Sequence, residues 1–153
     1  MKQIEQICSI LQGMGLAPAV DDNLIIVRFE MKIITIGVAS DEADDDAQED
    51  KFVTMLLGGI YEIEDESEMV DLLLTCNKLN RDMRQVKTFI TEDLKYINSS
   101  FEFWYCNEDD LKSSLGAGLF MFSSIKSYFY TTLHYIRSAS APEDADGTEG
   151  YEA

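Results

Sequence analysis

His134 is the only histidine in this 153-residue chain, so acid–base, nucleophilic or metal chemistry would be sought there first. A catalytic triad needs a nucleophile placed beside the histidine, and the sequence has no GxSxG motif. A zinc site needs further ligands at short spacing, whereas Cys8, Cys76 and Cys106 are far apart and form no CxxC pair. We therefore predict a surface or boundary histidine, three reduced cysteines, and no catalytic residue or cofactor.

Two acidic stretches could hold a divalent cation. Within the run from Asp41 to Asp50, Asp44, Asp46 and Gln48 have the every-other-residue spacing of a calcium loop. That loop also needs a glycine at its sixth position and a glutamate at its twelfth. Counted from Asp44, the sixth position is not glycine and the twelfth is Met55. A second run, residues 144–147, lacks the same partners, so we predict solvated carboxylates and no specific metal site.

Gly116-Ala117-Gly118 might be taken for a phosphate-binding loop. A P-loop has the pattern GxxxxGK[ST] between a strand and a helix, and this triplet lies inside a helical pattern without the lysine. Each interior glycine costs a helix about 1 kcal/mol relative to alanine. We expect both glycines to permit close packing of this helix against a sheet.

Lys78, Arg81, Arg84 and Lys87 gather four of the twelve bases near the end of the second predicted helix. Cations stabilise a helix C-terminus through its dipole. The same four residues could instead form a docking patch for an acidic ligand, including the acidic tail of this chain. Both interpretations remain open at the level of sequence.

The last predicted helix carries more aromatic side chains than one buried face needs. Phe120, Tyr128 and Tyr135 are spaced by eight and seven residues, so all three can share one face. They could be covered within the chain, or they could form an intermolecular contact, since aromatic residues are enriched in interface cores. The main apolar stripe of this helix points in a different direction and comprises Leu111, Leu115, Leu119, Phe122, Phe129, Leu133 and Ile136.

The formal charge of −17 is concentrated in two segments. Asp41 to Asp50 holds seven acids and residues 138–153 hold five, with no base in either, which leaves 17 acids against 12 bases elsewhere. Phosphate binding requires Lys and Arg, so nucleic acid and anionic membrane surfaces are disfavoured as partners. The N-terminus lacks the unbroken apolar stretch of a secretory signal, and we expect a cytoplasmic protein.

Apolar periodicity predicts an α+β domain with an antiparallel sheet and helices in two layers, in the order α-β-β-β-α-β-β-α. Asp65 and Glu68 have the spacing of a capping box, and Gly58-Gly59 suggests a bulge. We predict one domain over residues 1–137 and a disordered acidic tail over 138–153. The predicted elements are helix 4–14, strands 24–29, 32–38 and 51–61, helix 65–80, strands 84–90 and 94–105, and a last helix from 107 to 137.

The second predicted helix ends in Asn77-x-x-Asn80, followed by Arg81 and a strand hairpin whose first strand contains Lys87 to Phe89. In this motif and in the order of its elements, the chain resembles the YbjN family of small bacterial domains, which share their fold with type III secretion chaperones. The resemblance implies a non-enzymatic, sensory or regulatory role exercised through protein binding, and it supplies no catalytic residues. The acidic run and the aromatic last helix depart from the family pattern.

The sequence thus predicts a regulatory domain that binds a protein partner or a second copy of itself. Its possible partner-binding residues are Phe120, Tyr128, Tyr135, Lys78, Arg81, Arg84 and Lys87. Asn77 and Asn80 are expected to act structurally, by capping carbonyls or bridging to a neighbouring strand. The alternatives are a structural subunit of a larger complex and a small enzyme with an unrecognised site.

Overall fold

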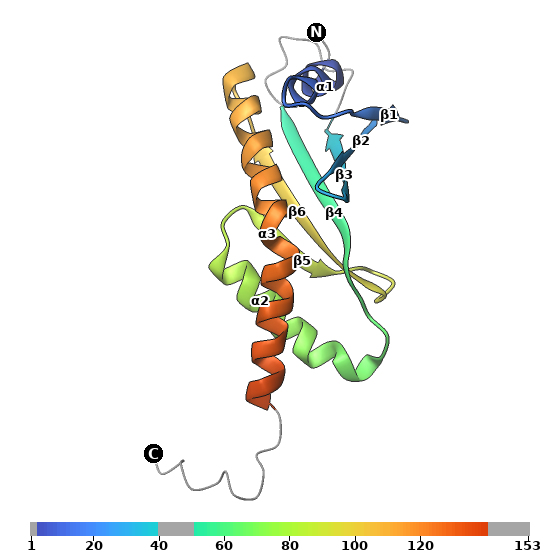
Figure 1. Cartoon of the computed structure of the whole chain (residues 1–153), viewed down its shortest axis with the longest axis vertical. Helices are drawn as coiled ribbons and strands as arrows, with labels where there is room; N and C mark the ends of the chain where they lie inside the picture. The colour runs from blue at the N-terminus through green and yellow to red at the C-terminus, as the bar shows by residue number, and fades with distance from the viewer. Residues whose placement is uncertain (1–2, 40–50, 141–153) are drawn as a thin grey trace, which may run out of the picture.

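The computed structural model describes residues 3–39 and 51–140, which form three helices and one antiparallel sheet (Figure 1). The predicted α+β class is confirmed. The acidic run and the tail beyond Ser140 lie outside the described residues, and so do the expectations placed on them. The elements are α1 Gln3–Gly13, β1 Ala19–Asp21, β2 Leu24–Phe29, β3 Lys32–Val38, β4 Phe52–Glu62, the 3-10 helix η2 Glu66–Glu68, α2 Met69–Asp82, β5 Val86–Ile90, β6 Tyr96–Trp104 and α3 Glu108–Ser140.

The observed elements differ from the prediction in one strand and in several boundaries. The short strand β1 was not predicted. The Asp22-Asn23 turn indicated the start of the strand that follows it, but not that a strand also precedes it. Helix α2 continues to Asp82, so the expectation that Asn80 ends this helix was wrong. Helix α3 runs three residues past the predicted limit at Arg137.

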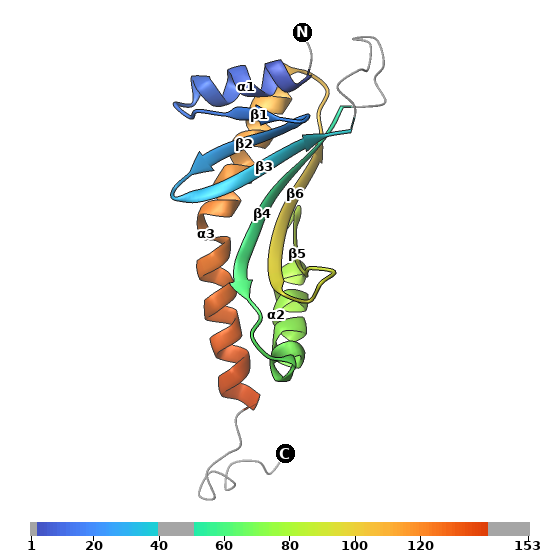
Figure 2. The same ribbon diagram turned by 90° about the vertical axis from the view of Figure 1, so that its right-hand side faces the viewer.

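The sheet has the strand order β1-β2-β3-β4-β6-β5, and every neighbouring pair is antiparallel. Its longest strand, β4, pairs with β6 on one side and with β3 on the other only as far as Leu57, which faces Ile34. Beyond Leu57 the register with β6 shifts, which confirms the predicted bulge, and Gly59 adopts a φ of +67°. The β2–β3 hairpin therefore diverges from β4 at this point (Figure 2).

Helices α1 and α3 lie on the same side of the sheet and bury one of its faces (Figure 2). Residues that alternate along the strands point into this core, because successive side chains of a strand face opposite ways. The predicted stripe of α3 is buried with the exception of Ile136, which is half-buried. The largest fully buried side chains include Phe101, Phe122, Phe129, Ile34, Ile36 and Met55.

The two glycines of α3 have different roles. A Cβ on Gly118 would collide with the side chain of Met55 and lie 2.9 Å from Cδ1 of Phe101. The expected close packing of helix on sheet is therefore confirmed for Gly118. A Cβ on Gly116 would have no neighbour within 4 Å, so the same expectation was wrong for Gly116.

Helix α2 lies beside β5, at the edge of the sheet (Figure 1). Asn80 reaches across from α2 and makes two hydrogen bonds to the backbone of Thr88: Oδ1 accepts from the Thr88 amide at 2.7 Å, and Nδ2 donates to the Thr88 carbonyl at 3.0 Å. These are the bonds that a further strand would make. An edge strand with unpaired backbone groups is a template for unwanted pairing, and Asn80 blocks it here.

No described element covers the other face of the sheet, although several of its residues are apolar. The single tryptophan, Trp104, is 66% exposed on this face and packs against Phe52 with ring centroids 4.8 Å apart. Four other large hydrophobic side chains of the strands are exposed on this face: Leu24, Ile33, Phe89 and Tyr96. We call these residues, together with Trp104, the open sheet face.

Candidate protein-binding groove between α2 and α3

Helix α3 extends past the sheet, and its C-terminal half packs against α2 (Figure 1). The end of α3 lies close to the start of α2, since Arg137 pairs with Glu68, and α2 crosses α3 obliquely (Figure 1). Between them lies a hollow of about 460 Å³, which we call the α2–α3 groove. Its lining residues are Lys78, Asp82, Tyr128, Thr131, Thr132 and Tyr135.

Two predicted partner-binding aromatics, Tyr128 and Tyr135, line this groove and remain 51% and 65% exposed. A tyrosine combines a large apolar ring with a hydroxyl that can both donate and accept a hydrogen bond. Such side chains are common where one protein surface closes on another. The groove therefore offers two aromatic anchors that the fold itself does not cover.

Charge at the groove comes from the ion pair between Lys78 and Asp82, whose Nζ and Oδ2 atoms are 3.0 Å apart. Both side chains are about two-fifths exposed, so the pair contributes little to stability, roughly 0.3–0.5 kcal/mol for this helical spacing. Its groups can exchange partners at low cost. A ligand segment carrying either charge could bind here alongside the tyrosines.

A polar cluster fixes the end of α3 against the start of α2. Arg137 Nη2 donates to Glu68 Oε1 at 2.9 Å and to the Tyr61 hydroxyl at 3.2 Å, while the Tyr61 hydroxyl also donates to Glu68 Oε1. The second oxygen of Glu68 accepts from the backbone amide of Glu64 at 2.9 Å. The predicted capping box between Asp65 and Glu68 is confirmed. One carboxylate thus joins β4, the start of α2 and the end of α3.

The ionisation of this cluster follows from its geometry. The hydrogen bond from Tyr61 lowers the pKa of the Glu68 carboxyl below its ordinary value, with help from the backbone amides and Arg137. Burial, followed by the hydrogen bond to Glu68, raises the pKa of Tyr61. The bond to the Tyr61 hydroxyl raises the pKa of Arg137. At neutral pH the cluster therefore contains a neutral phenol, a carboxylate and a guanidinium.

The other predicted partner-binding residues do not line the α2–α3 groove. Phe120 is 74% exposed on α3 but lies outside the hollow. Arg81 and Arg84 are exposed near the end of α2 and have no ion-pair partner within residues 3–39 and 51–140. Lys87 lies on the opposite face of the sheet and pairs with Glu102 at 2.9 Å. The predicted basic cluster is therefore divided between surfaces.

The residues considered for chemistry are dispersed. His134 is exposed on α3. The three cysteines are free, Cys76 is buried and Cys106 is exposed, and burial raises the pKa of Cys76 to about 11, which disfavours the reactive thiolate. In the part of the chain that the structure describes, no group of three or more His, Cys, Asp or Glu side chains could hold a metal ion.

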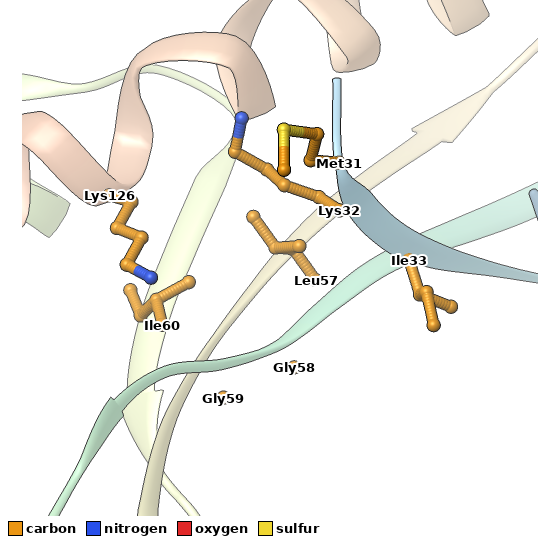
Figure 3. Close-up of a pocket in the computed structure, with 8 residues that line it drawn as sticks. All are labelled: Met31, Lys32, Ile33, Leu57, Gly58, Gly59, Ile60 and Lys126. Carbon is orange, nitrogen blue, oxygen red and sulfur yellow. The ribbon is translucent and has the colours of Figure 1, made fainter. Parts of the chain in front are cut away.

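A second hollow, which the sequence did not predict, lies where β3 and β4 diverge (Figure 3). It measures about 300 Å³. Residues at three places in the chain form it, and the one signal for it in the sequence is Gly58-Gly59, which indicates a bulge but not a cavity. We call it the splay pocket; it is lined by Met31, Lys32, Ile33, Leu57, Gly58, Gly59, Ile60 and Lys126.

Comparison with solved structures identifies the architecture. The crystal structure of YbjN from E. coli superposes with a TM-score of 0.60 over 86% of this chain and 92% of that chain, at 9% sequence identity. The chain has a YbjN-like fold. An uncharacterized protein from Methanothermobacter thermautotrophicus aligns with a TM-score of 0.49 and 13% identity, over 90% of this chain and 98% of its own. No family model and no curated protein sequence matches the chain.

At 9% identity, the similarity to YbjN concerns the fold alone. It confirms the expected architecture and brings no functional residue with it. None of the helices within the described ranges has the length and apolar character needed to cross a bilayer.

Proposed function

We propose that this protein is a non-enzymatic regulatory domain that binds a protein partner, and that a segment of the partner docks in the α2–α3 groove. The observation that carries the proposal is the pairing of two exposed tyrosines, Tyr128 and Tyr135, in one concave site. A two-layer domain leaves the outer side of its helices in water, and aromatic side chains are costly to leave there. A docked segment would cover them.

Charge supports a protein partner over a nucleic acid. YbjN is a candidate transcription regulator, and its fold is the one found here. With 29 acids and 12 bases, this chain would be repelled by DNA phosphates. We therefore infer that any regulatory action of this protein is exercised through another protein.

Site-specific photo-crosslinking tests the proposal. A photoreactive phenylalanine analogue would replace Tyr128 in one variant and Phe120 in another, each expressed in the native host. We expect a discrete cross-linked product from position 128 and none from position 120, because both side chains are exposed but only Tyr128 lines the groove. The Phe120 variant controls for capture of neighbours by any exposed position of α3.

The mass of the product identifies the occupant. Twice the mass of the chain would mean that a second copy occupies the groove, and light scattering on the purified protein would then give a dimer. Equal products from both positions, or none from position 128, would refute a specific docking site in the groove.

The open sheet face favours a second function, that of a structural subunit in a larger complex. Leu24, Ile33 and Trp104 are more than two-fifths exposed there, without a covering element in the described ranges. Exposed apolar residues on a sheet face that no described element covers are a candidate interaction site. If this face is buried in the native complex, an Ile33→Lys variant should dissociate from the complex and elute separately in size-exclusion chromatography. If the face is not buried there, the variant should co-elute with the complex as the wild type does.

A further inference from the structure

The splay pocket contains a combination of groups that the packing of the domain does not require. Where β3 separates from β4, Lys32 and Ile33 have no partner in β4, and Gly58 and Gly59 lie in the bulge. A Cβ on Gly59 would meet no atom within 4 Å, so the space beside this strand is open. Backbone and side chains here border a hollow of about 300 Å³, at the lower end of the range of small-molecule sites.

Two lysine side chains line this hollow from different elements, and their ammonium groups point to different parts of it (Figure 3). Figure 3 shows Lys126 extending from α3 toward Ile60 and Lys32 extending from β3 into the space between that strand and α3. Lys32 has only a long contact with Glu30, 3.7 Å between Nζ and Oε2. Lys126 has no acidic partner within residues 3–39 and 51–140. Because the chain is strongly acidic, a pocket whose lining includes two lysines and no acidic residue is an uncommon arrangement.

The floor and the rim of the pocket are apolar. Leu57 and Ile60 are only 4% and 3% exposed and form the floor. Met31 stands at the rim, 98% exposed, in a hairpin turn where both Glu30 and Met31 have left-handed φ values of 49° and 64°. Such turns strongly favour Asn and Gly, so this turn stores backbone strain beside the pocket. A flexible thioether at this position can fold over a bound aliphatic group.

We propose that the splay pocket binds a small monocarboxylate with a short aliphatic chain. In the complex the flexible side chains of Lys126 and Lys32 turn their ammonium groups toward the carboxylate, and the aliphatic part lies on Leu57 and Ile60 under Met31. Two separate ammonium groups suit a single carboxylate, and the apolar floor disfavours a bare inorganic anion, which needs polar contacts on all sides. This site is separate from the α2–α3 groove and stands independently of the function proposed for it.

Nuclear magnetic resonance of the full-length, nitrogen-15-labelled protein tests the proposal with three probes. Hexanoate supplies the charge and the chain, 1-hexanol supplies the chain alone, and inorganic phosphate supplies charge alone. We expect saturable shifts of the Gly58, Gly59 and Ile60 amides with hexanoate only. The amides of Tyr128 and Tyr135 should not move, which distinguishes this site from the α2–α3 groove.

Variants test the role of charge. Lys126→Met keeps the aliphatic stem and should weaken hexanoate binding about fivefold, the effect of one partly exposed ion pair, while Lys126→Arg should retain it. Lys112→Met removes an exposed lysine from the same helix, outside the pocket, and should leave the affinity unchanged. If Lys126→Met perturbs the spectrum of the free protein, Lys32→Met provides the same test from β3.

Any of four results would overturn the proposal. Hexanol shifts equal to those of hexanoate would mean that the pocket does not recognise charge. Phosphate binding as tight as that of hexanoate would mean that the apolar floor has no role. Unchanged affinity in both Lys126→Met and Lys32→Met, or an absence of saturable shifts at Gly58 and Gly59, would place any binding elsewhere.

Discussion

Single residues in this domain are constrained by their neighbours in ways that residue type alone does not reveal. Gly116 and Gly118 are two residues apart on α3, yet only Gly118 lies against Met55 and Phe101. Helical periodicity explains the difference: a shift of two residues turns a side chain by about 200° around the helix axis. The two positions therefore form a matched pair for experiment.

Substitution of these glycines by alanine should have opposite effects on stability. Gly118→Ala inserts a methyl group into a filled core and should lower the free energy of unfolding by about 1–3 kcal/mol. Gly116→Ala places its methyl group in open space and should raise it by about 0.5–1 kcal/mol through better helix propensity. Urea unfolding of both variants measures the difference, and equal effects would contradict the packing described for Gly118.

Glu68 gives the stability of the protein a defined pH dependence. Its pKa is lowered in the folded state, so its contribution is complete above the ordinary value of 4.5 and is lost as the pH falls through the folded value. Glu68→Gln should therefore cost about 1–2 kcal/mol at neutral pH and progressively less in acid. Glu66→Gln in the same short helix is the control. A stability difference between wild type and Glu68→Gln that stays constant from pH 7 to pH 3 would show that ionisation is not involved.

At the scale of elements, the edge of the sheet depends on one side chain of a helix. Asn80 satisfies both backbone groups of Thr88, and Asn77, one turn earlier on α2, is exposed. The two residues of the Asn-x-x-Asn motif therefore have unequal structural roles. Inside the sheet, Thr88 is further held by a hydrogen bond of 2.9 Å between its hydroxyl and that of Ser99.

Asn80→Ala should expose the edge strand β5. It leaves the Thr88 amide and carbonyl without their partners and should cost about 1–3 kcal/mol. Hydrogen exchange at the Thr88 amide should accelerate, and concentrated samples should aggregate more readily, because the edge becomes free to pair. Asn77→Ala should change stability by less than about 0.5 kcal/mol. Protection of Thr88 that survives Asn80→Ala would exclude this edge-blocking role.

The sequence predicted the elements well where local signals determine them, and the surfaces less well. The capping box at Asp65 and the stripe of α3 follow from short spacings along the chain, so they could be read directly. Strand β1, with three residues, is too short for a periodicity to appear. The splay pocket combines Lys32 with Lys126, which are 94 positions apart, and only the tertiary fold brings them together.

The open sheet face had a signal in the sequence that was not used. A strand with one solvated face alternates apolar and polar residues, whereas Leu24 to Val27 is apolar at every position. Such a run indicates that both faces are apolar. Tyr128 and Tyr135 are exposed, as a contact with a partner would require, but their combination with Lys78 in one groove depends on how α2 packs against α3.

At the scale of the whole molecule, α3 organises the domain. Its 33 residues extend about 50 Å, so the N-terminal half covers the sheet and the C-terminal half packs against α2. The polar cluster around Arg137 attaches the far end of α3 to the start of α2. Loss of this attachment would free the end of α3 from the start of α2.

Truncations separate the contribution of α3 from that of the acidic tail. A chain that ends at Ser140 should keep the thermal midpoint of the full protein, because residues 141–153 are small and acidic and offer little apolar area to bury. A chain that ends at Ile136 loses Arg137 and should melt several degrees lower. Differential scanning calorimetry measures both. A lower midpoint for the chain ending at Ser140 would show that the tail docks on the domain.

The position of Trp104 has a spectroscopic consequence. As the single indole of the chain, exposed beside Phe52 on the open sheet face, it should emit at long wavelength in the native protein and be readily quenched by iodide or acrylamide. Its emission maximum should therefore change little on unfolding, and it would be a poor reporter of stability. A partner that covers the open sheet face would shift the emission to the blue and protect it from quencher, whereas one bound in the α2–α3 groove would leave it unchanged. The fluorescence of one residue can thus tell which surface a partner occupies.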